Sequence, residues 1–258
     1  MKSKYGSICN DFLEEAHRIL GAAQAEGVLL RLLGALAFRM HCPKFGYMQD
    51  KLGRAFSDID FASYGNQSSK INKLFLLLGY QEDFLISRLF GKARLLFHDI
   101  QRKRHCDVFL DKLEFCHDIH FRNRLEVDEL TLPLAELLLE KMQIVKLDEK
   151  DIIDSIMLLR EHQIGASDKE TISAARIAEL CARDWGLWKT VTTSLRRVES
   201  YALRKQELSE EDKGDATSKI RSLLALMERE PKTTAWKLRA RVGENKKWYR
   251  DVEELSRI

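Results

Sequence analysis

The sequence is poor in the features that mark membrane-spanning and secreted proteins. It has only three prolines and five cysteines in 258 residues. No apolar run reaches the ~18 residues of a membrane-spanning helix, and the longest one, 28–40, contains Arg31 and Arg39. The N-terminal segment is charged and lacks the apolar core of a secretory signal. These absences predict a globular, cytoplasmic protein that does not use a membrane.

The cysteines do not follow a disulfide or zinc-finger pattern. Their number is odd and no CxxC pair occurs, which is typical of reduced intracellular thiols. The possible zinc ligands are Cys106, Cys116, His117 and His120, but their spacing matches neither common finger pattern. Cys106 also lies in an apolar run, where small thiols often pack in a core. We therefore favour structural thiols over a zinc site.

The net charge of the chain is small, and its aromatic residues divide it into two parts. The 43 basic and 40 acidic residues give a net charge of +3, too small by itself to indicate nucleic-acid binding. All twelve Phe lie at or before Phe121, and all four Trp lie at or after Trp185. With the secondary-structure patterns, this shift predicts an α/β core over 10–125, a helical extension over 126–164 and a helical C-terminal domain over 165–258.

The N-terminal part of the core contains a strand that leads into a helix. Asn10 or Asp11 can cap a first helix. The apolar segment 28–33 predicts a buried strand that passes through Gly34 into a helix over 34–41. Such a turn presents backbone N–H groups and the positive end of a helix, which suits a phosphate group. A plain tight turn explains the same glycine equally well.

The segment Asp58-Ile-Asp60-Phe predicts a strand with two acids on one face, because strand side chains alternate with a period of two. Two adjacent carboxylates repel each other unless a cation lies between them. One alternative is a solvated strand edge. The runs 93–98 and 105–111 predict a hairpin, and its second strand holds Asp107 among apolar residues. A buried carboxylate needs a partner, which a cation shared with the acid pair would supply.

Other segments are predicted from breakers and helical periodicity. Residues 44–53 are loop-like, with two glycines and mixed charge. After Asp118 the pattern is helical throughout, and Asp151 and Asp154 would lie near the start of one helix, where acids favour its dipole. The expected helices of the C-terminal region are 171–183, 187–205, 219–230 and 234–241.

Three acids on adjacent strands after a strand–glycine–helix turn predict a site for phosphoryl chemistry. A nucleoside triphosphate can be attacked at its α-phosphorus once cations neutralise its oxygens, and two ions about 3.5–4 Å apart can hold the attacking and leaving oxygens. We expect Asp58 and Asp60 to bridge Mg²⁺ or Mn²⁺ ions. Asp107 would bind the ion that activates the acceptor hydroxyl, and could serve as its base.

This arrangement resembles the nucleotidyltransferase superfamily of DNA polymerase β. The matching residues are Gly34-Ala35, Asp58-Ile-Asp60-Phe and Cys106-Asp107-Val. The resemblance implies an α/β (α+β) core with a small mixed sheet flanked by helices, followed by a mostly helical C-terminal domain. Where the family has Gly-Gly or Gly-Ser, this chain has Gly34-Ala35, so a phosphate-binding hydroxyl is missing there.

Within the superfamily, the chain looks most like bacterial proteins related to the abortive-infection toxin nucleotidyltransferases. That resemblance depends on Lys141 and on the Asp151-x-x-Asp154 pattern. It implies that Lys141 contacts the triphosphate, with Gly34, Ala35 and Ser57 also near the nucleotide. It further implies that Asp151 and Asp154 shape the acceptor side and that the helical extension completes the active-site cleft.

Two functions remain open from the sequence. The first is an enzyme that moves a nucleoside monophosphate from a nucleoside triphosphate to a hydroxyl of a tRNA end, a small molecule or a protein. The second is a catalytically degenerate binding module that acts on nucleic acid or a protein through the basic cluster between Lys237 and Arg250. The bulky groups Trp185, Trp188 and Trp248 are expected to serve in core packing or docking rather than base stacking.

Overall fold

A computed structural model describes residues 4–51, 53–90 and 92–252, so the two ends of the chain, 1–3 and 253–258, lie outside the described residues. The fold is mixed α/β with a helical C-terminal part, as predicted. It divides into two compact units. Unit 1 consists of the residues up to His41, Arg54–Leu113 and His120–Pro133. Unit 2 consists of Cys42–Gly53, Glu114–Ile119 and the residues from Leu134 onward.

Unit 1 is built around a mixed five-stranded sheet in the order β1-β2-β5-β4-β3. β2 and β5 are parallel, and the other neighbouring strands are antiparallel. β4 and β5 form the predicted hairpin. The elements of this unit are α1 (Phe12–Ala25), β1 (Arg31–Leu33), α2 (Gly34–His41), β2 (Asp58–Ser63), η1 (Gly65–Gln67), α4 (Ser68–Leu78), β3 (Gln81–Glu82), α5 (Phe84–Phe90), β4 (Arg94–Asp99) and β5 (Arg104–Leu110).

Local sequence signals explain where the helices of unit 1 begin and end. The side chain of Asp11 accepts hydrogen bonds from the backbone N–H groups of Leu13 and Glu14, so it is the N-cap of α1. Gly79 ends α4 in the left-handed conformation, at φ +94°, which glycine adopts without steric cost.

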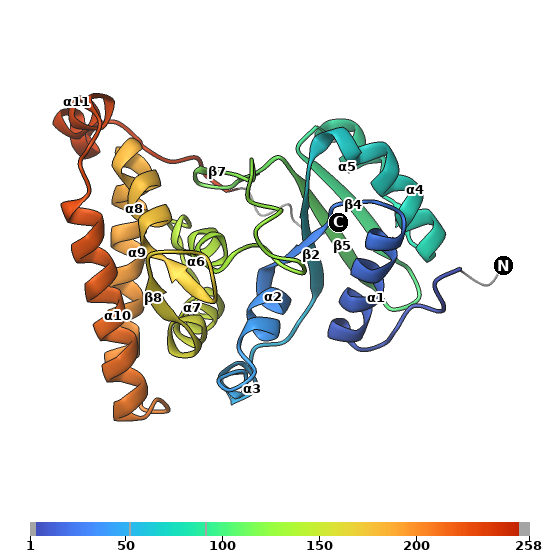
Figure 1. Cartoon of the computed structure of the whole chain (residues 1–258), viewed down its shortest axis with the longest axis horizontal. Coiled ribbons are helices and arrows are strands. Elements are labelled where there is room, and N and C mark those ends of the chain that lie inside the picture. Colours follow the sequence, from blue (N-terminus) through green and yellow to red (C-terminus); the bar gives the residue numbers. More distant parts are fainter. Residues whose placement is uncertain (1–3, 52, 91, 253–258) are drawn as a thin grey trace. The chain divides into compact units, whose positions relative to one another are not determined.

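The α4 helix covers one face of the sheet (Figure 1). Its Phe75 stacks on Phe97 of β4, with ring centroids 4.1 Å apart, and meets Phe61 of β2 edge-on. All three rings are fully buried. Burial of apolar and aromatic side chains of this size contributes about 1.5–3 kcal/mol each, so this face of the sheet forms the core of unit 1.

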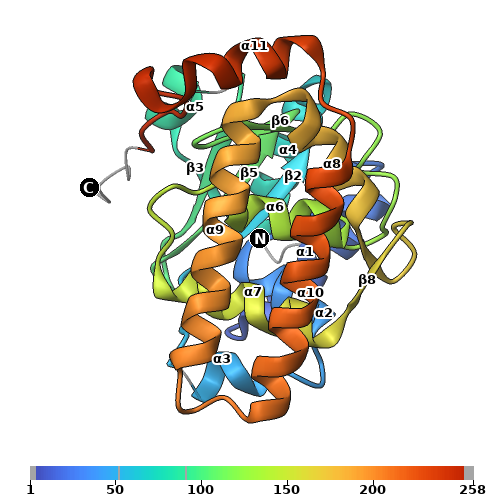
Figure 2. The same ribbon diagram turned by 90° about the vertical axis from the view of Figure 1, so that its left-hand side faces the viewer.

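Unit 2 is mostly helical. Figure 2 shows α9 and α10 side by side, with α11 across the end of α8 and α9. The elements are α3 (Tyr47–Lys51), α6 (Leu134–Met142), α7 (Glu149–Glu161), β8 (Gln163–Gly165), β9 (Thr171–Ser173), α8 (Ala174–Arg183), α9 (Trp185–Arg204), α10 (Glu210–Arg229), α11 (Thr234–Val242) and η2 (Gly243–Asn245). β6 (Lys112–Glu114) and β7 (Asp118–His120) form a separate two-stranded sheet.

Two predictions of local structure were wrong. Residues 47–51, expected in a loop, form α3, and its Gln49 is buried. The chain after Asp118 is not helical throughout, because it contains β7, β8 and β9. The residues on both sides of Gly165 belong to unit 2, although the composition shift suggested a boundary there. Unit 2 holds most of the predicted helical extension together with the described part of the C-terminal domain, and the three-part division remains a prediction.

Judged by length and hydropathy together, none of the helices among the described residues is a candidate membrane span.

Candidate functional site

The two strands that carry the predicted acids are neighbours. In the parallel pair of β2 and β5, Asp58 lies beside His105 and Asp60 lies beside Asp107. Residues paired across adjacent strands project to the same face, and so do residues two apart on one strand. Neighbouring strands are about 4.8 Å apart. The structure therefore brings the three aspartates together on one face of the sheet.

This face is polar, whereas the opposite face forms the core. On β2, Ile59 and Phe61 are fully buried, and Asp58 and Asp60 are partly exposed. β4 alternates between buried and partly exposed residues in the same way. On β2, β4 and β5, the ionisable side chains that strand alternation and register place on the polar face are Asp58, Asp60, Arg94, His98, His105 and Asp107. We call them the polar-face cluster.

Arg94 is the main partner of Asp107. Its Nε donates a hydrogen bond to Asp107 Oδ1 at 2.5 Å, and its guanidinium carbon lies 5.3 Å from the centre of the Phe109 ring. Burial disfavours the charged guanidinium, but the hydrogen bond and the charges of Asp107, Asp60 and Asp58 outweigh it and raise the pKa of Arg94. On the other side of the cluster, His105 Nε2 lies 3.7 Å from Asp58 Oδ2.

Sequence analysis missed Arg94, although the predicted hairpin contained the necessary signal. Once β4 and β5 are paired, the register sets Arg94 beside Phe109 and Leu96 beside Asp107. A residue two positions from Leu96 on the same strand is a diagonal neighbour of Asp107 and within reach of a long side chain. Correct counting across the turn would have identified this ion pair.

Gly34 makes a close contact with Asp60. The glycine has φ +71° at the start of α2, and a Cβ atom placed on it would overlap Asp60 Oδ2 and lie 3.2 Å from Asp60 Cγ. The positive φ alone favours glycine. The approach of the carboxylate adds a second requirement, because a side chain at residue 34 would force the Asp60 carboxylate to move.

The substitution Gly34→Ala is expected to reduce the free energy of unfolding by about 1–3 kcal/mol from backbone strain, with a further loss because Asp60 must move. Urea denaturation measures the change. Gly27→Ala is the matched control: Gly27 has φ +64°, and a Cβ added there would meet no atom of the described residues within 4 Å beyond its chain neighbours. If the two substitutions cost the same free energy, the contact with Asp60 has no energetic importance.

The remaining predicted nucleotide contacts in unit 1 lie at the ends of elements. Ala35 is the second residue of α2 and is partly exposed. Ser57 directly precedes β2 and is exposed. The structure thus places Gly34 against Asp60, with Ala35 next to it in the chain and Ser57 next to Asp58. Their predicted contacts with a nucleotide remain predictions.

Lys141 belongs to unit 2, where it lies among acids. Its Nζ is 3.0 Å from Asp151 Oδ1, 3.1 Å from Glu140 Oε1 and 3.8 Å from Asp154 Oδ2. Burial alone would lower the pKa of Lys141, but the charges of Asp151, Glu140 and Asp154 raise it well above its ordinary value. Within unit 2, Lys141 is therefore a positively charged side chain that is held by carboxylates.

The two acids of the Asp-x-x-Asp pattern have different environments. Asp151 lies in the first turn of α7 and is partly exposed, as expected for an acid that favours the helix dipole. Asp154 is completely buried, and its Oδ1 accepts a hydrogen bond from Gln49 Nε2 at 2.7 Å. Asp154 was interpreted as an acid near the helix start that favours the dipole, but it lies beyond the first turn of α7 and belongs to the core of unit 2.

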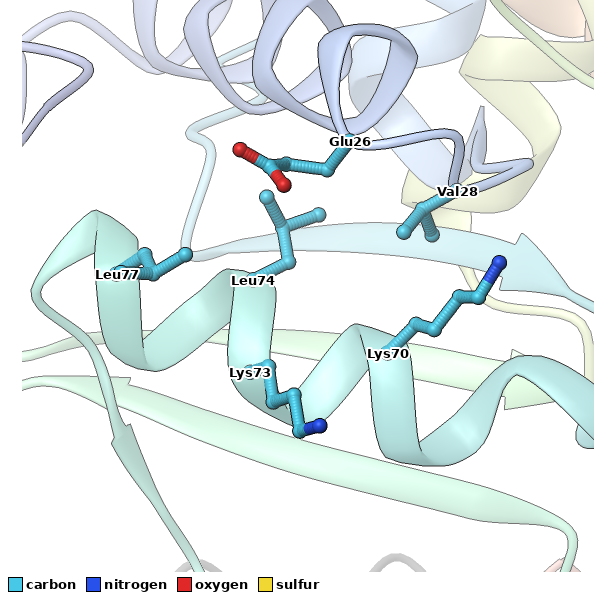
Figure 3. A pocket seen from close by; sticks show the side chains of 6 residues that line it. All are labelled: Glu26, Val28, Lys70, Lys73, Leu74 and Leu77. Carbon is cyan, nitrogen blue, oxygen red and sulfur yellow. The ribbon is translucent and has the colours of Figure 1, made fainter.

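A small pocket of about 140 Å³ lies on α4 beside the end of α1 (Figure 3). Its apolar floor consists of Val28, Leu74 and Leu77, and Lys70 and Lys73 border it. Glu26, at its edge, already forms an ion pair with Lys4. The lining residues do not include any of the acids of the polar-face cluster, so the pocket and the predicted site are distinct.

The donor set of the polar-face cluster suits Mg²⁺ or Mn²⁺, because these ions prefer carboxylate oxygens. One of these carboxylates, that of Asp60, lies against the backbone of Gly34. Among the described residues, no three His, Cys, Asp or Glu side chains are gathered closely enough to form a ready-made cation cage. Arg94 is paired with Asp107, so a cation that takes this carboxylate as a ligand would compete with the guanidinium.

Comparison of the chain with family models, with curated proteins and with solved structures gave no match.

Proposed function

We propose that the protein is a metal-dependent nucleotidyltransferase that moves a nucleoside monophosphate from a nucleoside triphosphate to a hydroxyl acceptor. The observation that carries this proposal is the register of β2 and β5, which sets Asp107 beside Asp60 on the face that also holds Asp58. Three like charges on one face are unfavourable without counter-charge. A divalent cation bound together with a triphosphate would be held by all three carboxylates.

The reaction needs little covalent chemistry from the protein. The acceptor oxygen would attack the α-phosphorus, the bond to the β-phosphate oxygen would break, and pyrophosphate would leave. Bound Mg²⁺ would supply neutralisation of the phosphate charge. Asp58 and Asp60 would hold the cations, and Asp107 would bind the ion that activates the acceptor hydroxyl and could take the proton of that hydroxyl. The position of the three side chains on the polar face supports these roles.

The start of α2 would bind the phosphates. Gly34 lies against Asp60, so the backbone N–H groups at this helix end are close to the acid that would hold the cation. Helix N-termini favour anions through the partial positive charge of their backbone N–H groups. The missing hydroxyl at Ala35 would be compensated by these backbone groups.

The proposal includes a subfamily and a cellular location. A bacterial protein related to the abortive-infection toxin nucleotidyltransferases would use Lys141 and the acids of α7 in its nucleotide or acceptor site. All five cysteines are free thiols, which suits a reducing cytoplasm, where nucleoside triphosphates are available. The acceptor would be a tRNA end, a small molecule or a protein hydroxyl.

The proposal is tested by incubating the protein with each α-³²P-labelled nucleoside triphosphate, Mg²⁺ and a bacterial extract. We expect one macromolecular or small-molecule fraction to become labelled, and the label to be lost when EDTA removes the metal. Absence of labelling with all four triphosphates and with either Mg²⁺ or Mn²⁺ would contradict the proposed activity.

A second candidate function is nucleic-acid binding by the C-terminal basic segment. Residues 231–250 contain a single acid, Glu244, and α11 has no buried residue. Lys237, Arg241 and Lys246 are exposed and have no ion-pair partner among the described residues. The basic residues of this segment are Lys232, Lys237, Arg239, Arg241, Lys246, Lys247 and Arg250.

This alternative predicts that charge reversal at Lys237, Arg241 and Lys246 weakens binding of a fluorescent single-stranded RNA. Loss of three phosphate contacts should reduce the slope of log K against log salt by about 2, as measured by fluorescence anisotropy. The matched control reverses three exposed charges on unit 1, at Lys70, Lys73 and Arg88. Equal effects of the two triple variants would argue against a specific surface.

A further inference from the structure

The ion pair between Arg94 and Asp107 is unusually well fixed for a partly exposed arginine. The Asp107 side chain is only 4% exposed and that of Arg94 26% exposed, with 2.5 Å between Nε and Oδ1. The guanidinium also lies against the ring of Phe109. Charge-assisted hydrogen bonds of this kind are about twice as strong as neutral ones. A cation that approaches Asp107 must therefore compete with Arg94.

Three aspartates share the face that carries Arg94. The charges of Asp60 and Asp58, besides that of Asp107, all act on its guanidinium. Carboxylate oxygens gathered on one face attract a divalent ion, which prefers such ligands. The same face thus carries both an attraction for a second cation and a built-in competitor for one of its ligands.

We propose that Arg94 is the resident counter-ion of Asp107 and is displaced when a divalent cation binds, so that Arg94 sets the affinity of the cation position at Asp107. This inference rests on the proposed nucleotidyltransferase function and deepens it. Arg94 keeps Asp107 hydrogen-bonded and neutralised in the absence of metal. It gives up the carboxylate only when the stronger charge of the divalent ion takes its place. Arg94 is thus a positioning residue for the third acid.

The inference predicts that removal of Arg94 strengthens metal binding. Mn²⁺ is titrated into the full chain without nucleotide, and the electron paramagnetic resonance signal of free Mn²⁺ reports binding. Arg94→Met is expected to bind Mn²⁺ about tenfold more tightly than the unmodified protein, because a charge-assisted hydrogen bond no longer competes. Arg94→Lys keeps a positive charge and should remain close to the unmodified protein.

Arg102→Met is the matched control. Arg102 is 27% exposed and lies 3.6 Å from the buried Asp99, whose side chain belongs to the opposite face of the sheet. Its removal should leave Mn²⁺ affinity unchanged. Circular dichroism confirms that each variant is folded before titration. Arg94→Gln, which has no charge but can still donate a hydrogen bond, should also bind Mn²⁺ more tightly than the unmodified protein, so it keeps the test available if Arg94→Met does not fold.

The outcomes separate this inference from the proposed function. If Asp60→Asn abolishes Mn²⁺ binding while Arg94→Met binds as weakly as the unmodified protein or more weakly, the cation site stands and the role of Arg94 is wrong. If Arg94→Met binds Mn²⁺ and the unmodified protein does not, Arg94 competes with the cation strongly enough to prevent binding, and the inference is confirmed. If neither Arg94→Met nor the unmodified protein binds Mn²⁺, both the inference and the cation site are wrong.

Discussion

Replacement of Asp60 by Asn is expected to reduce nucleotidyl transfer by on the order of 10³-fold or more, because the amide cannot supply a charged oxygen to a cation. The fold should survive. Asp60 is partly exposed on the polar face, beside Asp107 and two residues from Asp58. Asn has nearly the same size and shape as Asp and the position is partly exposed, so the free energy of unfolding should change little.

Labelled transfer and urea denaturation on the same preparation test both parts of this prediction. Asp111→Asn is the control, because Asp111 directly follows β5 and its carboxylate accepts a hydrogen bond from the N–H of Gly65. That variant should retain activity. Full activity of Asp60→Asn would show that this acid does not hold a catalytic cation, whereas unfolding of the variant would show that its role is structural.

The substitution Lys141→Met is expected to reduce the free energy of unfolding by about 3–5 kcal/mol, the usual cost when one partner of a buried ion pair is removed. Asp154 is completely buried and Glu140 is 4% exposed. Without Lys141, these carboxylates would lose the cation that balances them. Thermal or urea denaturation measures the loss, and the effect should be smaller at low pH, where the carboxylates can be protonated.

Lys205→Met provides the comparison for this prediction. Lys205 forms an ion pair at 3.0 Å with Glu149, whose side chain is 59% exposed, and such surface pairs contribute only about 0–1 kcal/mol. If Lys141→Met costs no more than Lys205→Met, the buried cluster around Lys141 is not important for stability. Its proposed role at the nucleotide would then be the better explanation for a lysine at this place.

The parts of the fold that the sequence predicted are those with strong local signals. Acidic and apolar residues alternate in the strand that contains Asp58, and apolar residues surround Asp107 in its strand. The hairpin follows from two β-prone runs with a basic turn between them. The cap at Asp11 and the strand–glycine–helix turn at Gly34 also follow from short-range rules. These elements placed the three aspartates on strands, whereas the pairing of β2 with β5, which makes these strands neighbours, is a contact between distant segments.

The parts that the sequence did not predict depend on contacts between distant residues. α3 has only five residues and no usable periodicity, and its Gln49 is defined by a hydrogen bond to Asp154, more than a hundred residues away. β8 and β9 have three residues each and exist because they pair with each other. The ion pair of Arg94 required a register that sequence patterns suggest only after the hairpin has been aligned.

The central claim is that Asp58, Asp60 and Asp107 jointly bind divalent cations for nucleotide transfer. Its most direct test is anomalous diffraction from crystals grown with Mn²⁺ and a non-hydrolysable nucleoside triphosphate. We expect Mn²⁺ about 2.1–2.2 Å from carboxylate oxygens of the three aspartates, with Arg94 moved away from Asp107. Manganese and nucleotide bound elsewhere, with the ion pair of Arg94 and Asp107 intact, would contradict the claim.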